Sequence, residues 1–293
     1  MKRRTFLKTL CGLGSITLLP AALSAQQYRF HFPDLSSDTQ EDESNDQEEE
    51  SSQEESDQLK ILIPLYSYPN WQEDDYVWQS LIDLKGEYPD IEIIAVVNPT
   101  NGHFNEEDSN YTQGITDLVD AEIKVVGYVY TQYGDRDTQE IIQDLDAWQD
   151  IYQSAGVSGI FFDETSTDIE LLDYYSNLSS EARERNFEYI VLNAGITTDQ
   201  SYIDSGIANL IVTYETTDAQ RQENPPSSYN EPSESTDLSL LIYEMEEDNV
   251  QELIDFAQEH QFGYIYFTED GFDGNPWDSV SSYLEEEISQ ALQ

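Results

Sequence analysis

The chain has 293 residues, enough for one large domain, and its 61 acidic and 12 basic residues give a net charge of −49. Such a charge repels phosphate backbones and anionic headgroups, which argues against binding to nucleic acids or membrane surfaces. The single cysteine, Cys11, leaves the rest of the chain without a disulfide, a thiol nucleophile or a cysteine metal site. Acidic residues continue through the whole of 58–293, which is typical of halophilic proteins because molar salt shortens the Debye length to about 3 Å. Attraction of a polycationic substrate is a compatible alternative.

Residues 1–25 have the features of a targeting segment. Arg3-Arg4-Thr5-Phe6-Leu7-Lys8 is a twin-arginine signature, and a modest apolar stretch with small residues follows it. The stretch is short and interrupted by glycine and proline, so we expect no stable membrane span after its removal, although an uncleaved anchor is the alternative. The protein is therefore expected to be exported to the periplasm or the cell exterior. Residues 26–57 are expected to be a disordered linker, since 34–57 holds twelve acidic residues, no basic one and almost nothing apolar.

From residue 58 onward, apolar runs alternate with amphipathic ones. The runs that indicate buried strands are 61–66, 91–97, 123–129, 159–163, 189–192, 210–214, 240–243 and 264–267. Helical patterns between them include 77–85, 138–154, 169–186, 249–260 and 277–292, while 216–236 is expected to be a long loop. Eight strand–helix units in this length predict an α/β fold of the (β/α)8, or TIM-barrel, type. An open doubly wound sheet is the alternative, but no strand is followed by a glycine-rich dinucleotide turn.

The ends of the predicted strands carry aromatic, amide and carboxylate side chains. In a (β/α)8 barrel these ends form the rim where active sites lie. The candidates in chain order are Tyr66, Tyr68, Asn98, Tyr128, Tyr130, Asp163 with Glu164, Asn193, Glu215, Tyr243 or Glu244, and Glu269 or Asp270. Aromatic platforms among hydrogen-bonding groups suit a sugar, which has an apolar face and a polar edge. Arg136 is the only guanidinium near this rim, so a phosphate clamp is not expected.

Two strands end abruptly in carboxylates, and this pattern is the sharpest signal in the chain. Asp163 is expected to point into the barrel mouth with Glu164 just above it, because neighbouring strand residues face opposite sides. Glu215, two strands further on, can reach the same crevice, and two close carboxylates separate their pKa values into an acid and a base or nucleophile. The alternative is that these are solvated loop acids in an acidic chain. Asn98 and Asn193 could bind sugar hydroxyls or cap the following helices.

Metal and cofactor chemistry finds no support in the sequence. The histidines His31, His103 and His260 are scattered, although His103 could touch substrate. The acidic run 270–275 misses the spacing of a calcium-binding EF-hand loop. We therefore expect no metal and no cofactor.

Residues 60–278 resemble the spherulin-4 family, also called spherulation-specific family 4. The motifs that carry the resemblance are Pro64-Leu65-Tyr66-Ser67-Tyr68-Pro69 with Trp71, Asn98-Pro99 with Gly102, Gly127-Tyr128-Val129-Tyr130-Thr131 with Tyr133-Gly134 and Arg136, Gly159-Ile160-Phe161-Phe162-Asp163-Glu164, Asn193-Ala194-Gly195, and Tyr214-Glu215. The resemblance implies a (β/α)8 barrel related to glycoside hydrolases that cut α-1,4-linked N-acetylgalactosamine or galactosamine exopolysaccharide. It also implies that Asp163, Glu164 and Glu215 are the acidic residues on which activity depends. The chain departs from the family pattern at Gly102-His103-Phe104 and at Ala194, in rim loops that would affect substrate preference.

These observations together predict a secreted glycoside hydrolase, expected to be a monomer, that acts on an amino-sugar polymer such as biofilm or capsule material. Asp163 would be the nucleophile or would stabilise an oxocarbenium ion, Glu215 would be the general acid/base, and Glu164 would orient one of them or the substrate. The two main roles could be exchanged, and either a retaining or an inverting reaction, or one assisted by the substrate's acetamido group, is compatible with the sequence. Sugar subsites would be lined by Tyr66, Tyr68, Asn98, Tyr128, Tyr130, Arg136 and Asn193. The alternatives are a non-catalytic glycan-binding barrel at the cell surface and a stress or structural protein with a merely solvated rim.

Overall fold

The computed structural model describes residues 58–70, 76–229, 236–246, 249–272 and 274–293. The predicted export signal and linker, residues 1–57, lie outside these residues, and so does Trp71. The predictions that depend on them therefore stay predictions.

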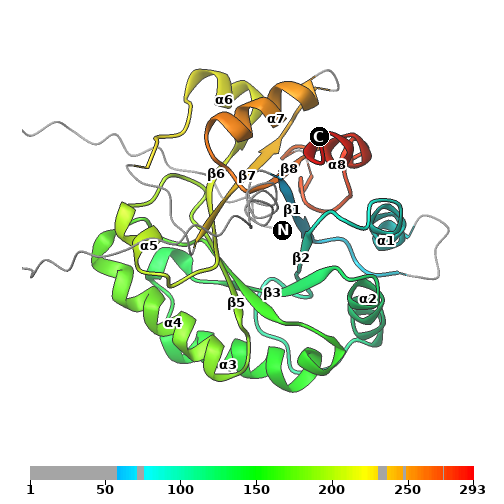
Figure 1. Ribbon diagram of the computed structural model, residues 1–293. Coiled ribbons are helices and arrows are strands. Elements are labelled where there is room, and N and C mark those ends of the chain that lie inside the picture. Colours follow the sequence, from blue (N-terminus) through cyan, green and yellow to red (C-terminus); the bar gives the residue numbers. More distant parts are fainter. Residues whose placement is uncertain (1–57, 71–75, 230–235, 247–248, 273) are drawn as a thin grey trace, which may run out of the picture. The chain divides into compact units, whose positions relative to one another are not determined.

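The described chain forms a closed barrel of parallel strands in sequence order, with the helices arranged around it (Figure 1). The strands are β1 (Lys60–Leu65), β2 (Ile93–Val97), β3 (Lys124–Tyr130), β4 (Gly159–Asp163), β5 (Tyr189–Asn193), β6 (Leu210–Thr217), β7 (Asp237–Tyr243) and β8 (Tyr264–Phe267). The main helices are α1 (Val77–Glu87), α2 (Ser109–Asp120), α3 (Thr138–Ala147), α4 (Leu172–Glu184), α5 (Gln200–Asp204), α6 (Asp218–Glu223), α7 (Val250–Glu259) and α8 (Leu284–Ala291). The barrel closes where β1 pairs with β8, Lys60 opposite Tyr264 and Ile61 opposite Ile265. This closure confirms the predicted (β/α)8 fold and rules out the open sheet.

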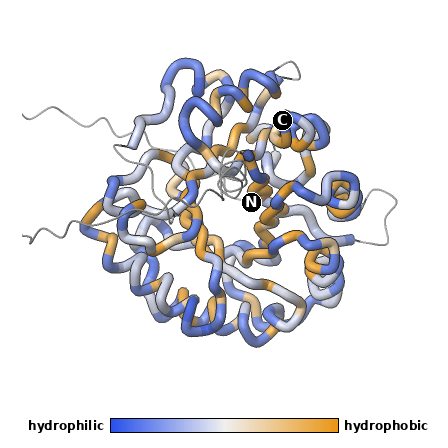
Figure 2. Tube along the Cα trace, in the orientation of Figure 1, coloured by the Kyte–Doolittle hydropathy of each residue, from blue (hydrophilic) through white to orange (hydrophobic). Residues whose placement is uncertain are grey.

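Most of the core lies between the strands and the inner faces of the helices. The apolar residues follow the strands at the centre of Figure 2, and polar residues cover the outer turns of the helices. Two strand glycines make close packing possible. A Cβ on Gly159 would lie 2.1 Å from the carbonyl oxygen of Tyr189, and one on Gly127 would lie 2.5 Å from the indole of Trp148. Gly159 therefore allows β5 to approach β4 closely, and Gly127 allows Trp148 to approach β3.

The expected helices and loop differ from the observed structure in three places. The predicted helix 277–292 begins only at Leu284, because the chain from Asn275 to Tyr283 instead forms a loop that passes the barrel mouth. The predicted loop 216–236 begins with the last two residues of β6, and the short helix α6 follows them. The predicted helix 138–154 is α3 followed by a π-helical turn, Trp148–Tyr152, and a 3₁₀ turn, Gln153–Ala155.

An ionic cluster ties together the N-terminal ends of the strands. Glu92 Oε1, just before β2, accepts hydrogen bonds from Lys124 Nζ at 3.0 Å and from Tyr264 Oη at 2.8 Å. Lys60 Nζ lies 3.9 Å from Glu92 Oε2 and 3.6 Å from Asp237 Oδ2. Two of the three lysines in 58–293 are thus used to hold the strands together at the end opposite to the rim.

Candidate active site

Four consecutive strands bring hydrogen-bonding side chains together at the C-terminal rim of the barrel. Tyr128 Oη, from β3, donates to Asp163 Oδ2, at the end of β4, over 2.8 Å. Asn193 Nδ2, at the end of β5, donates to Asp163 Oδ1 over 2.9 Å and also to Glu215 Oε2, on β6, over 2.9 Å. A single amide nitrogen therefore joins the two carboxylates.

This bridge limits the separation of Asp163 and Glu215. Two oxygens that each lie 2.9 Å from one nitrogen are at most about 5.8 Å apart, twice that distance. Because the two N–H bonds of an amide diverge by about 120° and hydrogen bonds prefer to be straight, the separation of these oxygens is about 5 Å. This spacing is close to the value of about 5–5.5 Å that retaining glycosidases use, and shorter than the 6.5–9.5 Å of inverting ones.

A β-bulge directs Glu215 toward the crevice. The pairing of β6 with β7 shifts by one residue between Val212 and Tyr214. Thr213 lines a cavity on the outer side of the barrel, and the ring of Tyr214 packs against the helix layer, with its centroid 6.2 Å from that of Phe256 on α7. Since two successive residues face outward, the next residue, Glu215, returns to the interior side.

Burial and the neighbouring charge change the acidity of both carboxyls. Burial, followed by the charge of Asp163, raises the pKa of Glu215 from 4.5 to about 7, against the opposing effect of hydrogen bonds from Asn193 and Trp277. Burial also raises the pKa of Asp163, opposed by the donors of Tyr128 and Asn193 and the backbone of Glu164. Asp163 accepts from two side-chain donors within 3 Å, which favour its ionised form, whereas Glu215, with a pKa of about 7, can hold a proton near neutral pH.

Glu164 has a constrained backbone beside the pair. Its φ of 52° lies in the left-handed region, which is uncommon for a residue other than glycine. Its carbonyl oxygen accepts from Tyr133 N over 2.7 Å and from Thr131 Oγ1 over 2.8 Å, and these bonds hold the turn after β4. The charge of Glu164, after burial, raises the pKa of the Tyr133 hydroxyl, so this carboxylate lies on the Tyr133 side of the crevice.

Aromatic side chains surround the carboxylates. The rings of Tyr66 and Tyr128 meet edge to face with centroids 5.6 Å apart. Burial, then the charges of Asp163 and Glu215, raises the pKa of Tyr66, so its hydroxyl stays protonated and can act as a donor. Trp277 is almost fully buried, and its indole opposes the rise in the pKa of Glu215. The floor of the crevice is thus made of rings, with polar groups aimed at its centre.

Comparison with known proteins identifies the lineage of this barrel. The model of the family described as "Spherulation-specific family 4" matches residues 60–291. The chain belongs to the spherulation-specific family 4. Spherulin-4 from Physarum polycephalum is 27% identical over 244 residues, which cover 80% of this chain and 70% of that protein. The crystal structure of Aspergillus clavatus Sph3 in complex with GalNAc matches with a TM-score of 0.67 and 26% identity, covering 80% of this chain and 98% of that one.

The family motifs do not all contribute side chains to the carboxylate pair. Asn98 is buried and closes its own loop, accepting from Asn101 N at 2.8 Å and donating to Asn101 Oδ1 at 2.7 Å. Tyr68 is 51% exposed and donates to Asp108 Oδ2 at 2.9 Å, at the start of α2. Both residues were predicted to bind substrate, which stays a prediction, and the structure shows each of them hydrogen-bonded within the β1 and β2 loops.

Arg136 supports the rim from beneath, contrary to the expectation that it lines a sugar subsite. Its side chain is buried and pairs with Asp144 Oδ2 on α3 at 2.6 Å. Its guanidinium stacks on the ring of Tyr130 at 4.1 Å and donates to the Tyr130 carbonyl at 2.9 Å. The other carboxylate oxygen of Asp144 lies 3.1 Å from His103 Nδ1. Arg136 therefore positions Tyr130 and joins the loops after β2 and β3 to α3.

The position of Trp277 beside the candidate site was not predicted from the sequence. It was assigned to a helix because apolar residues recur after it at helical spacing, but Pro276 directly before it and the turn residues around it indicate a loop. The loop is held at the rim, since Tyr66 N donates to the Trp277 carbonyl at 2.8 Å.

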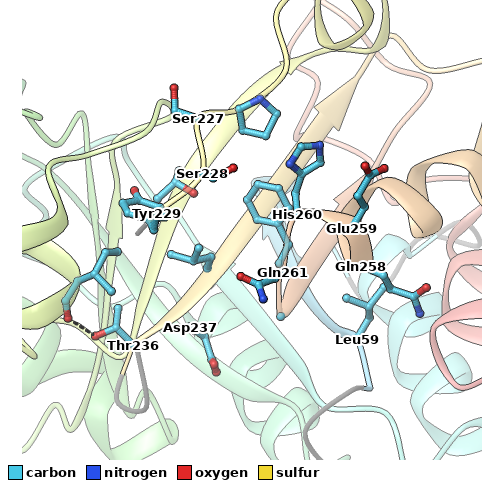
Figure 3. Close-up of a pocket in the computed structure, with 16 residues that line it drawn as sticks. Leu59, Ser227, Ser228, Tyr229, Thr236, Asp237, Gln258, Glu259, His260 and Gln261 are labelled. Atoms are coloured by element: carbon cyan, nitrogen blue, oxygen red, sulfur yellow. Dashed lines mark hydrogen bonds between the residues drawn. The ribbon is translucent and has the colours of Figure 1, made fainter. Parts of the chain in front are cut away.

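A cavity of about 650 Å³ lies away from this site (Figure 3). Its wall includes Leu59 before β1, Asp237 at the start of β7 and Phe262 before β8, all at the N-terminal ends of strands. Barrel enzymes use the opposite end for chemistry. The crevice at Asp163 and Glu215 is therefore the better candidate active site.

Metal ligands and membrane spans were sought in the same residues. Across 58–293, apart from the gaps in the description, no three His, Cys, Asp or Glu side chains are grouped closely enough to hold a metal ion. Among the helices of these described residues, none combines the length and apolar character needed to cross a bilayer.

Proposed function

We propose that this protein is a glycoside hydrolase that cleaves an amino-sugar exopolysaccharide of the α-1,4-linked N-acetylgalactosamine/galactosamine type. The observation that carries the proposal is the Asp163–Asn193–Glu215 bridge, which holds two carboxylates about 5 Å apart while the pKa of Glu215 is about 7. The match to Sph3, solved with GalNAc, supports a glycan as the ligand.

In the proposed reaction, Glu215 is the general acid. As the bond between C1 and the glycosidic oxygen breaks, Glu215 gives its proton to that oxygen. Asp163, whose ionised form is favoured by the donors Tyr128 and Asn193, either forms a bond to C1 or stabilises the positive charge while the substrate's acetamido oxygen forms that bond. Glu215, now a carboxylate, then takes a proton from water as the water oxygen bonds to C1. The group bound there, Asp163 or the acetamido oxygen, leaves C1, and the configuration is retained overall.

The other site residues have supporting roles. Asn193 fixes the separation of the two carboxylates, and Tyr128 and Tyr66 provide hydroxyl donors and ring surface at the reacting sugar. Glu164, in its constrained turn, orients the substrate on the Tyr133 side. A sugar ring with one apolar face fits this combination of donors and rings.

We further propose a monomer that is exported through the twin-arginine route and works in concentrated salt. Arg3 and Arg4 support the export route. The salt requirement is supported by the excess of carboxylates along 58–293 and by the pairing of its few cations, such as Lys124 with Glu92 and Arg221 with Asp218.

The test is cleavage of the polymer by the full chain in molar salt, followed by the release of reducing ends. Wild type should cleave, and Asp163→Asn and Glu215→Gln should each lose at least about 100-fold in kcat, as groups that act at the transition state do. Glu188→Gln is the matched control, because Glu188 is exposed at the other end of the barrel, before β5. If wild type binds the polymer but releases no ends, the protein is a glycan-binding barrel and the hydrolase proposal is wrong.

A further inference from the structure

An aromatic wall extends from Glu215 to the solvent on the β7–β8 side of the crevice. Trp277, whose indole influences the pKa of Glu215, meets the ring of Tyr243 edge to face with centroids 6.0 Å apart. Tyr243 in turn meets Phe272 edge to face at 4.9 Å. Phe272 is 63% exposed, so the wall ends in an open ring face. None of the proposed catalytic steps uses this ring.

The loop that carries Phe272 is held at several points. Glu269 accepts from Ser281 Oγ at 3.1 Å and from Ser282 N at 3.2 Å, which joins the two ends of the β8–α8 loop. Tyr66 N holds the middle of the loop through the carbonyl of Trp277. These bonds hold the two ends and the middle of the loop, and the edge-to-face contact with Tyr243 positions the ring of Phe272 beside the wall.

We propose that Phe272, supported by Tyr243, is the stacking platform for a second sugar ring of the polymer, next to the one at the carboxylates and on the Glu215 side. This inference rests on the proposed function. A galacto-configured ring has an axial 4-hydroxyl, so the hydrogens of C3, C4 and C5 form a continuous apolar patch on one face, which an open aromatic ring can cover. A single exposed apolar residue is ordinary on a protein surface, but this ring continues a row of rings that begins at Glu215.

The opposite wall makes a platform at this position useful. Tyr133, 54% exposed, lies on the Glu164 side, with a φ of 56° and its amide bonded to the Glu164 carbonyl. Exposed rings therefore lie on both sides of the carboxylates. A polymer that runs from Tyr133 to Phe272 passes over Asp163 and Glu215 between them.

The test compares Phe272→Ala with Phe272→Tyr, which keeps a ring, and with Val119→Ala, which truncates an exposed apolar side chain on the outer helix α2. The probes are the α-1,4-linked polymer and its oligosaccharides of increasing length. Phe272→Ala should raise KM about three- to tenfold with little change in kcat, for the polymer and for each oligosaccharide that is cut, because every scissile bond joins the ring at the carboxylates to the ring on the Glu215 side. Phe272→Tyr and Val119→Ala should behave like wild type.

A binding measurement separates this inference from the proposed function. Retention of the full chain by the polymer in affinity electrophoresis is measured with and without Phe272→Ala in the Asp163→Asn background. Weaker retention of the double variant supports the platform even if wild type proves unable to cleave. Equal retention of the two proteins, or a KM of Phe272→Ala that equals that of wild type, overturns it.

Discussion

Glu215→Gln should stabilise the protein at alkaline pH, and this prediction needs no substrate. The carboxyl is protonated in both the folded and the unfolded chain below its ordinary pKa of 4.5, whereas above about pH 7 the folded protein must hold it ionised beside Asp163. Because folding raises the pKa of Glu215, this carboxyl contributes fully to stability below pH 4.5, and the contribution is lost as the pH rises through 7. Glutamine keeps the shape of the side chain and never ionises.

The size of the effect follows from the site. A rise in pKa from 4.5 to about 7 corresponds to roughly 3 kcal/mol, at about 1.4 kcal/mol per pKa unit. Glu215 keeps some contact with solvent, which reduces this value, and glutamine offers one acceptor oxygen to the two donors Asn193 and Trp277, which costs about 1 kcal/mol. The net gain is about 1–2 kcal/mol, or an increase in Tm of about 2–8 °C for a domain of this size.

The assay is thermal unfolding of wild type, Glu215→Gln and the control Glu188→Gln in molar salt, at about pH 4 and about pH 8.5. We expect Glu215→Gln to unfold at a higher temperature than wild type at the alkaline pH and to lose that advantage at the acidic one. A difference in Tm that is the same at both pH values would show that Glu215 is not held ionised at a cost, and the assignment of this residue as the acid would then be wrong.

Three further predictions follow from other contacts. Asn193→Ala should lower kcat by roughly 100-fold and move the alkaline limb of the pH–rate profile upward by about one pH unit, since the donor that stabilises the ionised form of both carboxyls is lost. An unchanged profile would contradict the bridge. Glu287→Gln should raise Tm at pH 8 but not at pH 4, because Glu287 is fully buried, its Oε1 lacks a hydrogen-bond partner and burial raises its pKa. The control is Glu285→Gln at an exposed position, and equal shifts in Tm at both pH values would refute the prediction. Lowering NaCl from about 1 M to about 0.1 M should lower Tm, since the Debye length grows from about 3 to about 10 Å, and an unchanged Tm would count against salt adaptation.

The strands could be predicted because a parallel barrel buries them on both faces. The runs at β4 and β8 match the predicted ranges 159–163 and 264–267 residue for residue, since each is apolar throughout until it ends. The start of β7 was predicted at 240 but lies at Asp237, because Ser239 is buried in the sheet although it is polar. A pattern based on hydrophobicity ends at such a residue, whereas backbone pairing continues through it.

The polar centre of the site could also be predicted from the strand ends, because Asp163, Asn193 and Glu215 follow directly from the geometry of consecutive parallel strands. The sequence does not show that one amide holds both carboxylates, which depends on the bulge at Thr213. Trp277 could not be placed by periodicity, because the path of the loop that carries it is set by contacts such as Tyr66 N to its carbonyl. The same reason explains Asn98, whose partner Asn101 lies in its own loop, and Tyr68, whose partner Asp108 lies in the next loop.

The acidity of the whole chain and the acidity of the site have different physical origins. The net charge of −49 arises from carboxylates distributed along the whole sequence, whose mutual repulsion weakens as salt shortens the Debye length. The pKa of Glu215 is raised by its own burial and by Asp163, a neighbour joined to it through one Asn193 nitrogen. Interactions at that range inside a crevice are screened far less by dissolved ions than those between surface charges. A change in salt should therefore alter the stability of the barrel much more than the protonation of its acid, which lets a chain with this surface keep the same chemistry over a wide range of ionic strength.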